Sequence, residues 1–153
     1  TALGGQDRGY LPVVVIAKCP AEYKASINEQ QEIQRKAKEE EQRLLAMNMS
    51  MEELMTEGER VYLAACAACH MPNGEGLPGV FPALNVSPMA LTYIPAHIDI
   101  VLNGKTGTAM QAFDKQLTLS EIAAVVTYER NAWGNNTGDI VQAKDVNAIA
   151  TGE

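Results

Sequence analysis

The feature that most constrains this chain is one run of five residues, Cys66-Ala67-Ala68-Cys69-His70. A Cys-x-x-Cys-His run is the pattern at which a c-type haem is attached. The two thiols form thioethers with the haem vinyl groups, and two intervening residues on a helical turn let both sulfurs reach one ring. The adjacent imidazole then lies under the iron. We therefore predict one covalent haem c bonded to Cys66 and Cys69, with His70 as the proximal iron ligand.

Two other uses of a cysteine pair agree less well with the surrounding sequence. A thioredoxin-like pair follows a strand and precedes a helix, whereas the residues before Cys66 have a helical pattern and a Gly/Pro-rich loop follows His70. A structural zinc site needs four ligands, usually with a second pair at similar spacing. The remaining candidates, Cys19 and His97, are single and far apart. Cys19 also has no partner for a disulfide.

Length and charge indicate one compact domain with additional segments and argue against nucleic acid as a partner. The 153 residues include 12 basic and 19 acidic side chains, for a net charge of −7. No run approaches the ~20 apolar residues that span a bilayer, and no basic-then-apolar signal opens the chain. Because haem c is attached on the exported side of the bacterial inner membrane, we expect a periplasmic location or one at the outer face of that membrane, with any anchor outside this chain.

The first 49 residues are predicted to form two segments. Residues 1–26 contain Val13-Val14-Val15-Ile16-Ala17, a β-branched run typical of a buried strand. One strand cannot form a sheet, so we interpret this segment as the remnant of another domain. Residues 27–49 are polar and helix-forming, with i,i+4 pairs at Glu32–Lys36 and Glu39–Arg43. They predict a solvated connector helix.

Residues 50–135 have the pattern of a small helical domain. Ser50 and Thr118 each precede a Glu by three residues, which predicts a capping box at the start of two helices. The first helix carries Gly58 on its apolar face, and a residue without a side chain suits close crossing by a second helix. A short helix is expected over residues 93–103. Residues 136–153 show no strong period and are predicted to be a surface tail.

The loop after His70 is rich in Gly and Pro and cannot be regular structure. We expect it to cover the proximal face of the cofactor. A carbonyl near Pro78 or Pro82 is predicted to accept a hydrogen bond from the His70 ring and orient it, as groups behind metal-bound imidazoles do.

The second axial ligand is predicted to be Met110. This residue lies in a Gly/Thr-containing loop between two expected helices, which suits a strap across the distal face. Met89 and His97 rank behind it and stay open as alternatives. A thioether favours ferrous iron and raises the potential. With both axial sites filled, oxygen cannot bind, so the expected activity is electron transfer and not chemistry on a substrate.

Residues 50–135 resemble a class I cytochrome c domain, which implies an all-α fold around one covalent haem. A wider resemblance is to the end of bacterial cytochrome c oxidase subunit II, in the form that fuses a cytochrome c domain to a cupredoxin domain. It rests on three segments: Tyr10-Leu11-Pro12-Val13-Val14-Val15, residues 97–104 (HIDIVLNG) and residues 128–135 (YERNAWGN). This resemblance implies that electrons pass from a donor cytochrome c, or another redox protein, toward the membrane subunits of a haem-copper oxidase.

The chain departs from the subunit II pattern at its copper loop. That family's loop reads Cys-x-x-x-Cys-x-x-x-His-x-x-Met-Pro, and a register on Pro12 places Gly4, Arg8 and Leu11 at ligand positions. None of these residues offers a thiolate, imidazole or thioether, so no copper is expected in this chain.

Two alternatives to an oxidase relay remain open. One is a free, diffusible periplasmic cytochrome, which would not copurify with membrane subunits. The other is a haem-based sensor or enzyme with an open distal site, which carbon monoxide would reveal in the optical spectrum.

Overall fold

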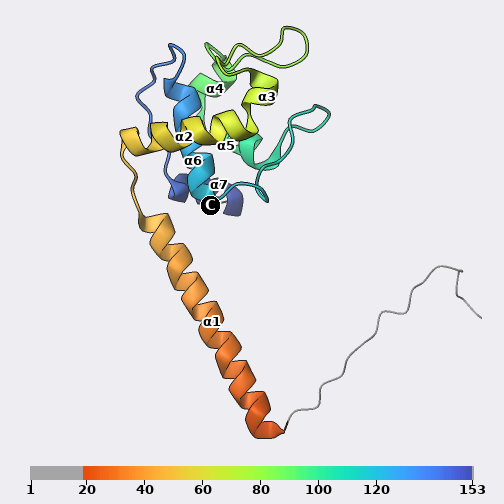
Figure 1. The fold of residues 1–153 in the computed structure, drawn as a ribbon, viewed down its shortest axis with the longest axis vertical. Helices are drawn as coiled ribbons and strands as arrows, with labels where there is room; N and C mark the ends of the chain where they lie inside the picture. Colours follow the sequence, from red (N-terminus) through yellow and green to blue (C-terminus); the bar gives the residue numbers. More distant parts are fainter. Residues whose placement is uncertain (1–18, 153) are drawn as a thin grey trace, which may run out of the picture. The chain divides into compact units, whose positions relative to one another are not determined.

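The structure is a computed structural model, and it describes residues 19–152. The predicted strand at residues 13–17 and the positions aligned with copper ligands, Gly4, Arg8 and Leu11, lie outside the described residues. The chain divides into two compact units, residues 1–39 and 40–153. The boundary falls inside the first helix (Figure 1).

Helix α1 (Pro20–Ala46) begins earlier than the predicted connector helix, which was expected from residue 27. Proline suits the first turn of a helix because its fixed φ is helical and its missing N–H is not needed there. The Glu22 carboxylate also accepts a hydrogen bond from the Cys19 backbone N–H at 3.3 Å. The expected end of the N-terminal remnant at residue 26 therefore falls within a helix.

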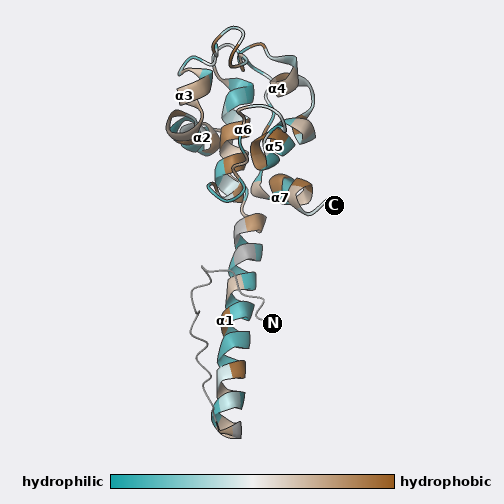
Figure 2. Ribbon diagram, turned by 90° about the vertical axis from the view of Figure 1, so that its right-hand side faces the viewer, coloured by the Kyte–Doolittle hydropathy of each residue, from teal (hydrophilic) through white to brown (hydrophobic). Residues whose placement is uncertain are grey.

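The surface of α1 is solvated, as predicted, and the predicted Glu32–Lys36 pair is present at 3.6 Å. The other ion pairs differ from the prediction. Arg35 bonds to Glu32 at 2.6 Å and also contacts Glu39. Arg43 pairs with Glu40 three residues before it, and not with Glu39. These side chains are exposed, and Figure 2 shows hydrophilic colour over much of the helix.

Two crossing helices form the centre of the second unit, α2 (Met51–Ala65) and α6 (Leu119–Asn131) (Figure 1). Both predicted capping boxes are present: the Ser50 hydroxyl accepts from the Glu53 N–H at 3.3 Å, and the Thr118 hydroxyl accepts from the Glu121 N–H at 3.2 Å. Gly58 faces the backbone of α6, which confirms the predicted close crossing.

Three shorter helices complete the frame around α2 and α6. They are α3 (Ala67–His70), α4 (Pro88–Thr92) and α5 (Ile94–Asn103). Helix α5 matches the predicted segment and ends at Gly104, where φ is +70°. Helix α4 was not predicted, because five residues are too few to show a period.

The core lies between α2, α5, α6 and the C-terminal segment, and Figure 2 shows hydrophobic colour on α5 and α6. Its buried apolar side chains include Leu54, Val61, Tyr62, Ile98, Val101, Leu102, Ile122, Val125, Val126, Val141 and Val146. The predicted all-α class is confirmed for the described residues.

The prediction of a surface tail over residues 136–153 is wrong. Helix α7 (Ala143–Thr151) packs on α5 and α6, and Val141 and Val146 are fully buried. The side chain of Gln142 accepts a hydrogen bond from the Met49 N–H at 3.0 Å and donates one to the Met49 carbonyl at 2.8 Å. Only a few apolar residues of this nine-residue helix face the core, which leaves no clear period to read.

Across residues 19–152, every helix falls short of the length and apolar character needed to cross a membrane.

Candidate functional site

The three residues of the haem motif lie on one turn at the end of α2. Cys66 is the C-cap residue of α2, and α3, which contains Cys69 and His70, follows directly. The His70 N–H donates to the Cys66 carbonyl at 3.0 Å, which closes a helical turn around the two intervening alanines. Cys66 is buried and Cys69 half-buried. The structure thus places the two predicted attachment thiols on a single helical turn.

The ring of His70 is oriented by the loop that follows it. Its Nδ1 atom lies 2.9 Å from the carbonyl oxygen of Pro82, one of the two positions expected to supply this contact. A carbonyl oxygen can only accept, so Nδ1 carries the hydrogen and Nε2 keeps its lone pair. The imidazole is therefore held in the tautomer that can bind a metal through Nε2.

The loop after His70 is fixed by backbone contacts that require glycine. The Gly76 N–H donates to the His70 carbonyl at 2.9 Å, and the Gly74 carbonyl accepts from the Leu84 N–H at 2.7 Å. Gly74 has φ +70°, and a Cβ there would lie 2.4 Å from Cε3 of Trp133. Trp133 in turn donates from its indole nitrogen to the Pro72 carbonyl at 3.0 Å. The indole thus covers the loop and holds it in place.

An aromatic cluster of Tyr62, Tyr128 and Trp133 contacts the same loop. The Tyr62 hydroxyl donates to the Met71 carbonyl at 2.6 Å. Its ring centre lies 4.6 Å from that of Trp133 and 5.6 Å from that of Tyr128. Burial, with a smaller contribution from nearby negative charge, raises the pKa of Tyr62, so the phenol stays protonated and keeps donating. The sequence alone did not indicate this role for Tyr62.

Met110 lies in a loop that folds back on the end of α5. The Lys105 N–H donates to the Met110 carbonyl at 3.0 Å, and the Phe113 N–H donates to the Val101 carbonyl at 3.1 Å. A Cβ on Gly104 would lie 2.7 Å from the Met110 carbonyl oxygen, so this approach requires glycine. The half-buried Met110 side chain packs against the same hydrophobic cluster that contains Cys66.

The two alternative axial ligands occupy different environments. Met89 is on α4 and is 49% exposed. His97 is on α5 and is buried, with its Nε2 atom 2.7 Å from the Glu129 carboxylate. The sequence alone did not indicate this partner, because Glu129 lies 32 residues from His97.

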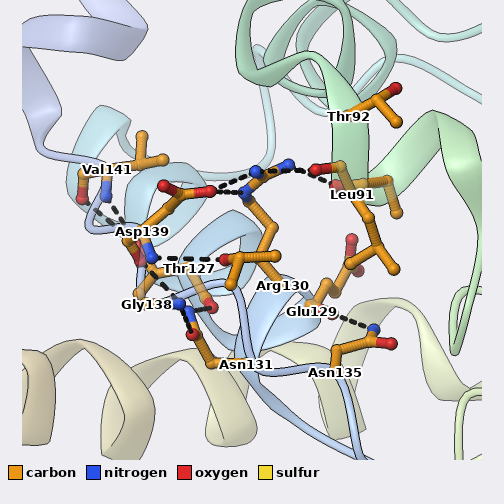
Figure 3. A network of polar contacts seen from close by, with 12 residues as sticks. Leu91, Thr92, Thr127, Glu129, Arg130, Asn131, Asn135, Gly138, Asp139 and Val141 are labelled. Carbon is orange, nitrogen blue, oxygen red and sulfur yellow. Dashed lines mark hydrogen bonds and ion pairs between the residues drawn. The ribbon is translucent and has the colours of Figure 1, made fainter.

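A buried polar network near the end of α6 ties the loops to the core (Figure 3). The guanidinium of Arg130 donates to the carbonyls of Ala90 and Leu91 and forms an ion pair with Asp139. The Arg130 guanidinium holds the pKa of Asp139 below its usual value. This network joins α4 to the segment before α7.

Asn135 forms a second link, between α6 and the loop that ends near Val86. Its amide donates to the Glu129 carbonyl at 2.7 Å and to the Leu84 carbonyl at 3.2 Å, and its oxygen accepts from the Val86 N–H at 2.9 Å. Sequence reasoning missed Arg130 and Asn135, whose hydrogen-bond partners are 6 to 51 residues away.

The residues present fit a covalent haem. Two thiols lie on one helical turn, the adjacent buried imidazole has its Nε2 lone pair available, and a thioether packs against the same cluster as one of the thiols. A zinc site finds no support in the described part of the chain, where no group of three or more His, Cys, Asp or Glu side chains could hold a metal ion.

Comparison with known proteins identifies the family of this chain. Residues 53–128 match the family described as cytochrome C oxidase, cbb3-type, subunit III. The chain is also 35% identical over 94 residues to cytochrome c-552 of Thermus thermophilus, a match that covers 52% of this chain and 70% of that protein. The chain belongs to the cytochrome c family. It therefore has a class I cytochrome c fold, binds haem c covalently and transfers electrons through it.

Other relatives of this cytochrome c are subunits of dehydrogenases. The cytochrome c subunit of alcohol dehydrogenase (quinone) from Gluconobacter oxydans is 34% identical over 104 residues, which cover 61% of this chain and 22% of the relative. The gluconate 2-dehydrogenase cytochrome c subunit of Pantoea cypripedii is 32% identical over 107 residues, with 63% and 24% covered. The chain thus spans less than a quarter of the length of these two relatives.

Proposed function

We propose that the chain moves single electrons through a six-coordinate haem bonded to Cys66 and Cys69, with His70 and Met110 as axial ligands. The observation that carries this proposal is the hydrogen bond from His70 Nδ1 to the Pro82 carbonyl, because it leaves Nε2 as the only ring atom able to bind iron. The packing of Met110 against the cluster that contains Cys66 supports the second ligand.

Each residue has a separate role in this scheme. The haem supplies an iron that accepts and releases one electron. Cys66 and Cys69 prevent its loss, and His70 fixes its proximal side through the Pro82 carbonyl. Met110 would bind the iron as the second protein ligand, and its thioether would keep oxygen and carbon monoxide from the metal. The buried core of α2, α5 and α6 keeps water away and limits rearrangement on electron transfer.

The destination of the electrons is proposed to be a haem-copper oxidase. The resemblance of residues 97–104 and 128–135 to oxidase subunit II supports this route. In the structure these two segments meet where His97 bonds to Glu129. The matching family model is itself named for a cytochrome c oxidase subunit. By this proposal residues 1–26 are the end of a cupredoxin-like domain without copper, 27–49 a linker, 50–135 the cytochrome domain, and 136–153 a C-terminal segment.

A second candidate is the cytochrome domain of a membrane dehydrogenase. The observation that favours it is the similarity to the alcohol and gluconate dehydrogenase cytochrome c subunits. Both candidates place the chain in the periplasm or at the outer face of the bacterial inner membrane. They differ in the partner subunits.

Purification of the full-length protein from the membranes of its host distinguishes the candidates. Oxidase subunits in the purified complex are the expected result, and dehydrogenase subunits would overturn the oxidase route. A protein recovered free of both would be a diffusible cytochrome. Metal analysis of the isolated chain should give about one iron and negligible copper per chain, because Gly4, Arg8 and Leu11 cannot bind copper.

The axial ligands are tested separately by optical spectroscopy of the isolated chain. The oxidised protein should show the charge-transfer band of a thioether–iron bond, and the reduced protein should not bind carbon monoxide. Binding of carbon monoxide by the unmodified protein would point to a sensor or enzyme with an open distal site.

A further inference from the structure

A histidine and a glutamate form a buried pair between α5 and α6. The Nε2 atom of His97 lies 2.7 Å from Oε2 of Glu129, and the two residues are only 4% and 3% exposed. The other ring nitrogen, Nδ1 of His97, is also buried. Within the described part of the chain, it is the one buried side-chain nitrogen or oxygen without a hydrogen-bond partner. Buried polar atoms are rarely left in this state, so the site needs an explanation.

The geometry of the pair determines which nitrogen of His97 can bind and release a proton. The Glu129 carboxylate is an acceptor, so the hydrogen between the two side chains resides on Nε2 of His97. On the imidazole ring, a second proton can then add only at Nδ1. Without it the pair has a net charge of −1, and with it the pair is neutral overall.

Two opposing effects act on the Nδ1 proton. The lack of a partner for Nδ1 disfavours the charged imidazolium in a buried site. The adjacent Glu129 carboxylate favours it. Because these two effects oppose each other, a further charge that appears nearby can change the proton affinity of Nδ1.

The pair is electrostatically connected to the proposed haem site. Burial raises the pKa of the Cys66 thiol, and the Glu129 carboxylate raises it further. The same carboxylate also raises the pKa of Tyr62 on α2. The pair and this thiol also lie in one core, because Ile98 and Tyr128, the sequence neighbours of His97 and Glu129, belong to the hydrophobic cluster that contains Cys66.

Neighbouring charges on α6 do not neutralise the pair. The guanidinium of Arg130, next to Glu129 in sequence, is engaged with Asp139 and with the carbonyls of Ala90 and Leu91 (Figure 3).

The charged side chains of the other packed helices are engaged elsewhere or exposed. Asp99 on α5 is exposed and accepts from Asn103 at 2.7 Å. On α7, Lys144 is exposed and Asp145 accepts from the Gln142 N–H at 2.8 Å. Helix α4 has no titratable side chain. On α2, Glu52, Glu53, Glu59 and Arg60 are exposed, and Glu57 accepts from Arg60 at 2.6 Å.

We propose that the His97–Glu129 pair binds a proton when the haem is reduced and releases it when the haem is oxidised. This proposal rests on the proposed function, because it requires a haem bonded to Cys66. On oxidation one electron leaves for the redox partner, the Nδ1–H bond of His97 breaks and the proton passes to water. The cause is electrostatic: oxidation adds one positive charge at the haem, which opposes the positive charge of the imidazolium.

The first test is an NMR titration of the intact haem protein with carbon-13 in its histidines. The chain has only two histidines, and with His70 on the iron, His97 is the only imidazole free to titrate. We expect His97 to bind its proton at least about threefold more tightly in the reduced than in the oxidised protein. Equal affinity in the two states, or no titration between about pH 5 and 9, would overturn the proposal.

The second test is the pH dependence of the midpoint potential. A tenfold difference in proton affinity corresponds to a change of about 59 mV for a one-electron couple across the transition. The potential should fall as pH rises through the titration of His97. His97→Gln should abolish this component, and Glu129→Gln should move it, since the amide still accepts the hydrogen bond but carries no charge. Glu52→Gln, the same charge change at an exposed position of α2, should leave it in place.

An unchanged pH profile in His97→Gln, with an intact haem spectrum, would overturn the role of the pair without affecting the proposed function. If the unmodified protein did not show the spectrum of a six-coordinate haem, that result would instead contradict the proposed function. If His97→Gln fails to fold, the titration of the unmodified protein decides the proposal.

Discussion

Gly58 on α2 lies against the main chain of Ala124 on α6, so closely that an added Cβ would be 2.3 Å from the Ala124 carbonyl oxygen. The same atom would be 2.5 Å from Cβ of Tyr128. The contact of these two helices therefore depends on the absence of one methyl group. Because α2 ends in the haem-binding turn and α6 carries Glu129, their crossing also sets the position of the site.

Gly58→Ala should destabilise the haem protein. Alanine is the better helix former by about 1 kcal/mol, but separating two packed helices costs more, and we expect a net loss of about 1–3 kcal/mol. Denaturant unfolding followed by circular dichroism measures this change. Ala64→Ser, at an exposed position of the same helix, should change stability by less than about 0.5 kcal/mol. Equal stability of Gly58→Ala and the unmodified protein would mean that the crossing is looser than the structure shows.

Replacement of both Cys66 and Cys69 by alanine should prevent stable folding. The compact unit is small, and its apolar side chains face a space that the covalent haem is proposed to fill. Circular dichroism should show loss of most of the helical signal from this unit, while α1 can retain some helix. Cys19→Ala, which removes the exposed cysteine outside the unit, is the control and should fold normally. A native spectrum from the haem-free double variant would contradict this architecture.

Met110→Ala should open the distal side of the iron. Removal of a thioether ligand lowers the midpoint potential and lets carbon monoxide bind the reduced protein. Optical spectra with and without carbon monoxide, together with a redox titration, measure both effects. Met89→Ala is the matched control, because Met89 is exposed on α4 and should leave both properties unchanged. An unaltered spectrum and potential in Met110→Ala would place the ligand elsewhere.

Asp139→Asn should lower stability at neutral pH and have less effect in acid. The folded pKa of Asp139 is depressed, chiefly by its hydrogen bond to Arg130, so its contribution is present above about pH 4 and is lost as pH falls through the folded pKa. The loss at pH 7 should be below about 1 kcal/mol, because the Asp139 side chain is 36% exposed. Unfolding measured at pH 7 and pH 3 checks this.

The comparison for Asp139 is Glu75→Gln, an exposed carboxylate in the loop after His70. Glu75→Gln should change the free energy of unfolding little at either pH, because Glu75 is not part of the Arg130–Asp139 ion pair. A difference between Asp139→Asn and the unmodified protein that persists undiminished at pH 3 would show that the carboxylate stabilises the fold through something other than its charge.

Local pattern was sufficient for several features of this protein. The run from Cys66 to His70 predicted the covalent haem, and Ser50 and Thr118 each predicted a helix start that the structure confirms. Gly58 predicted a close crossing without indicating its partner. These features depend on residues within a few positions of one another, or on a single missing side chain, so the sequence alone reveals them.

Other features were decided only by the tertiary structure. The period of α7 is too short to be recognised, yet Val146 is fully buried because α5 and α6 offer it a surface. Whether Pro78 or Pro82 orients His70 depended on the path of a loop. The sequence left His97 open as an alternative axial ligand, and the structure makes it half of a buried pair because Glu129, 32 residues later, faces it from α6. The energy of such contacts depends on distance in space, and no local pattern in the sequence encodes that distance.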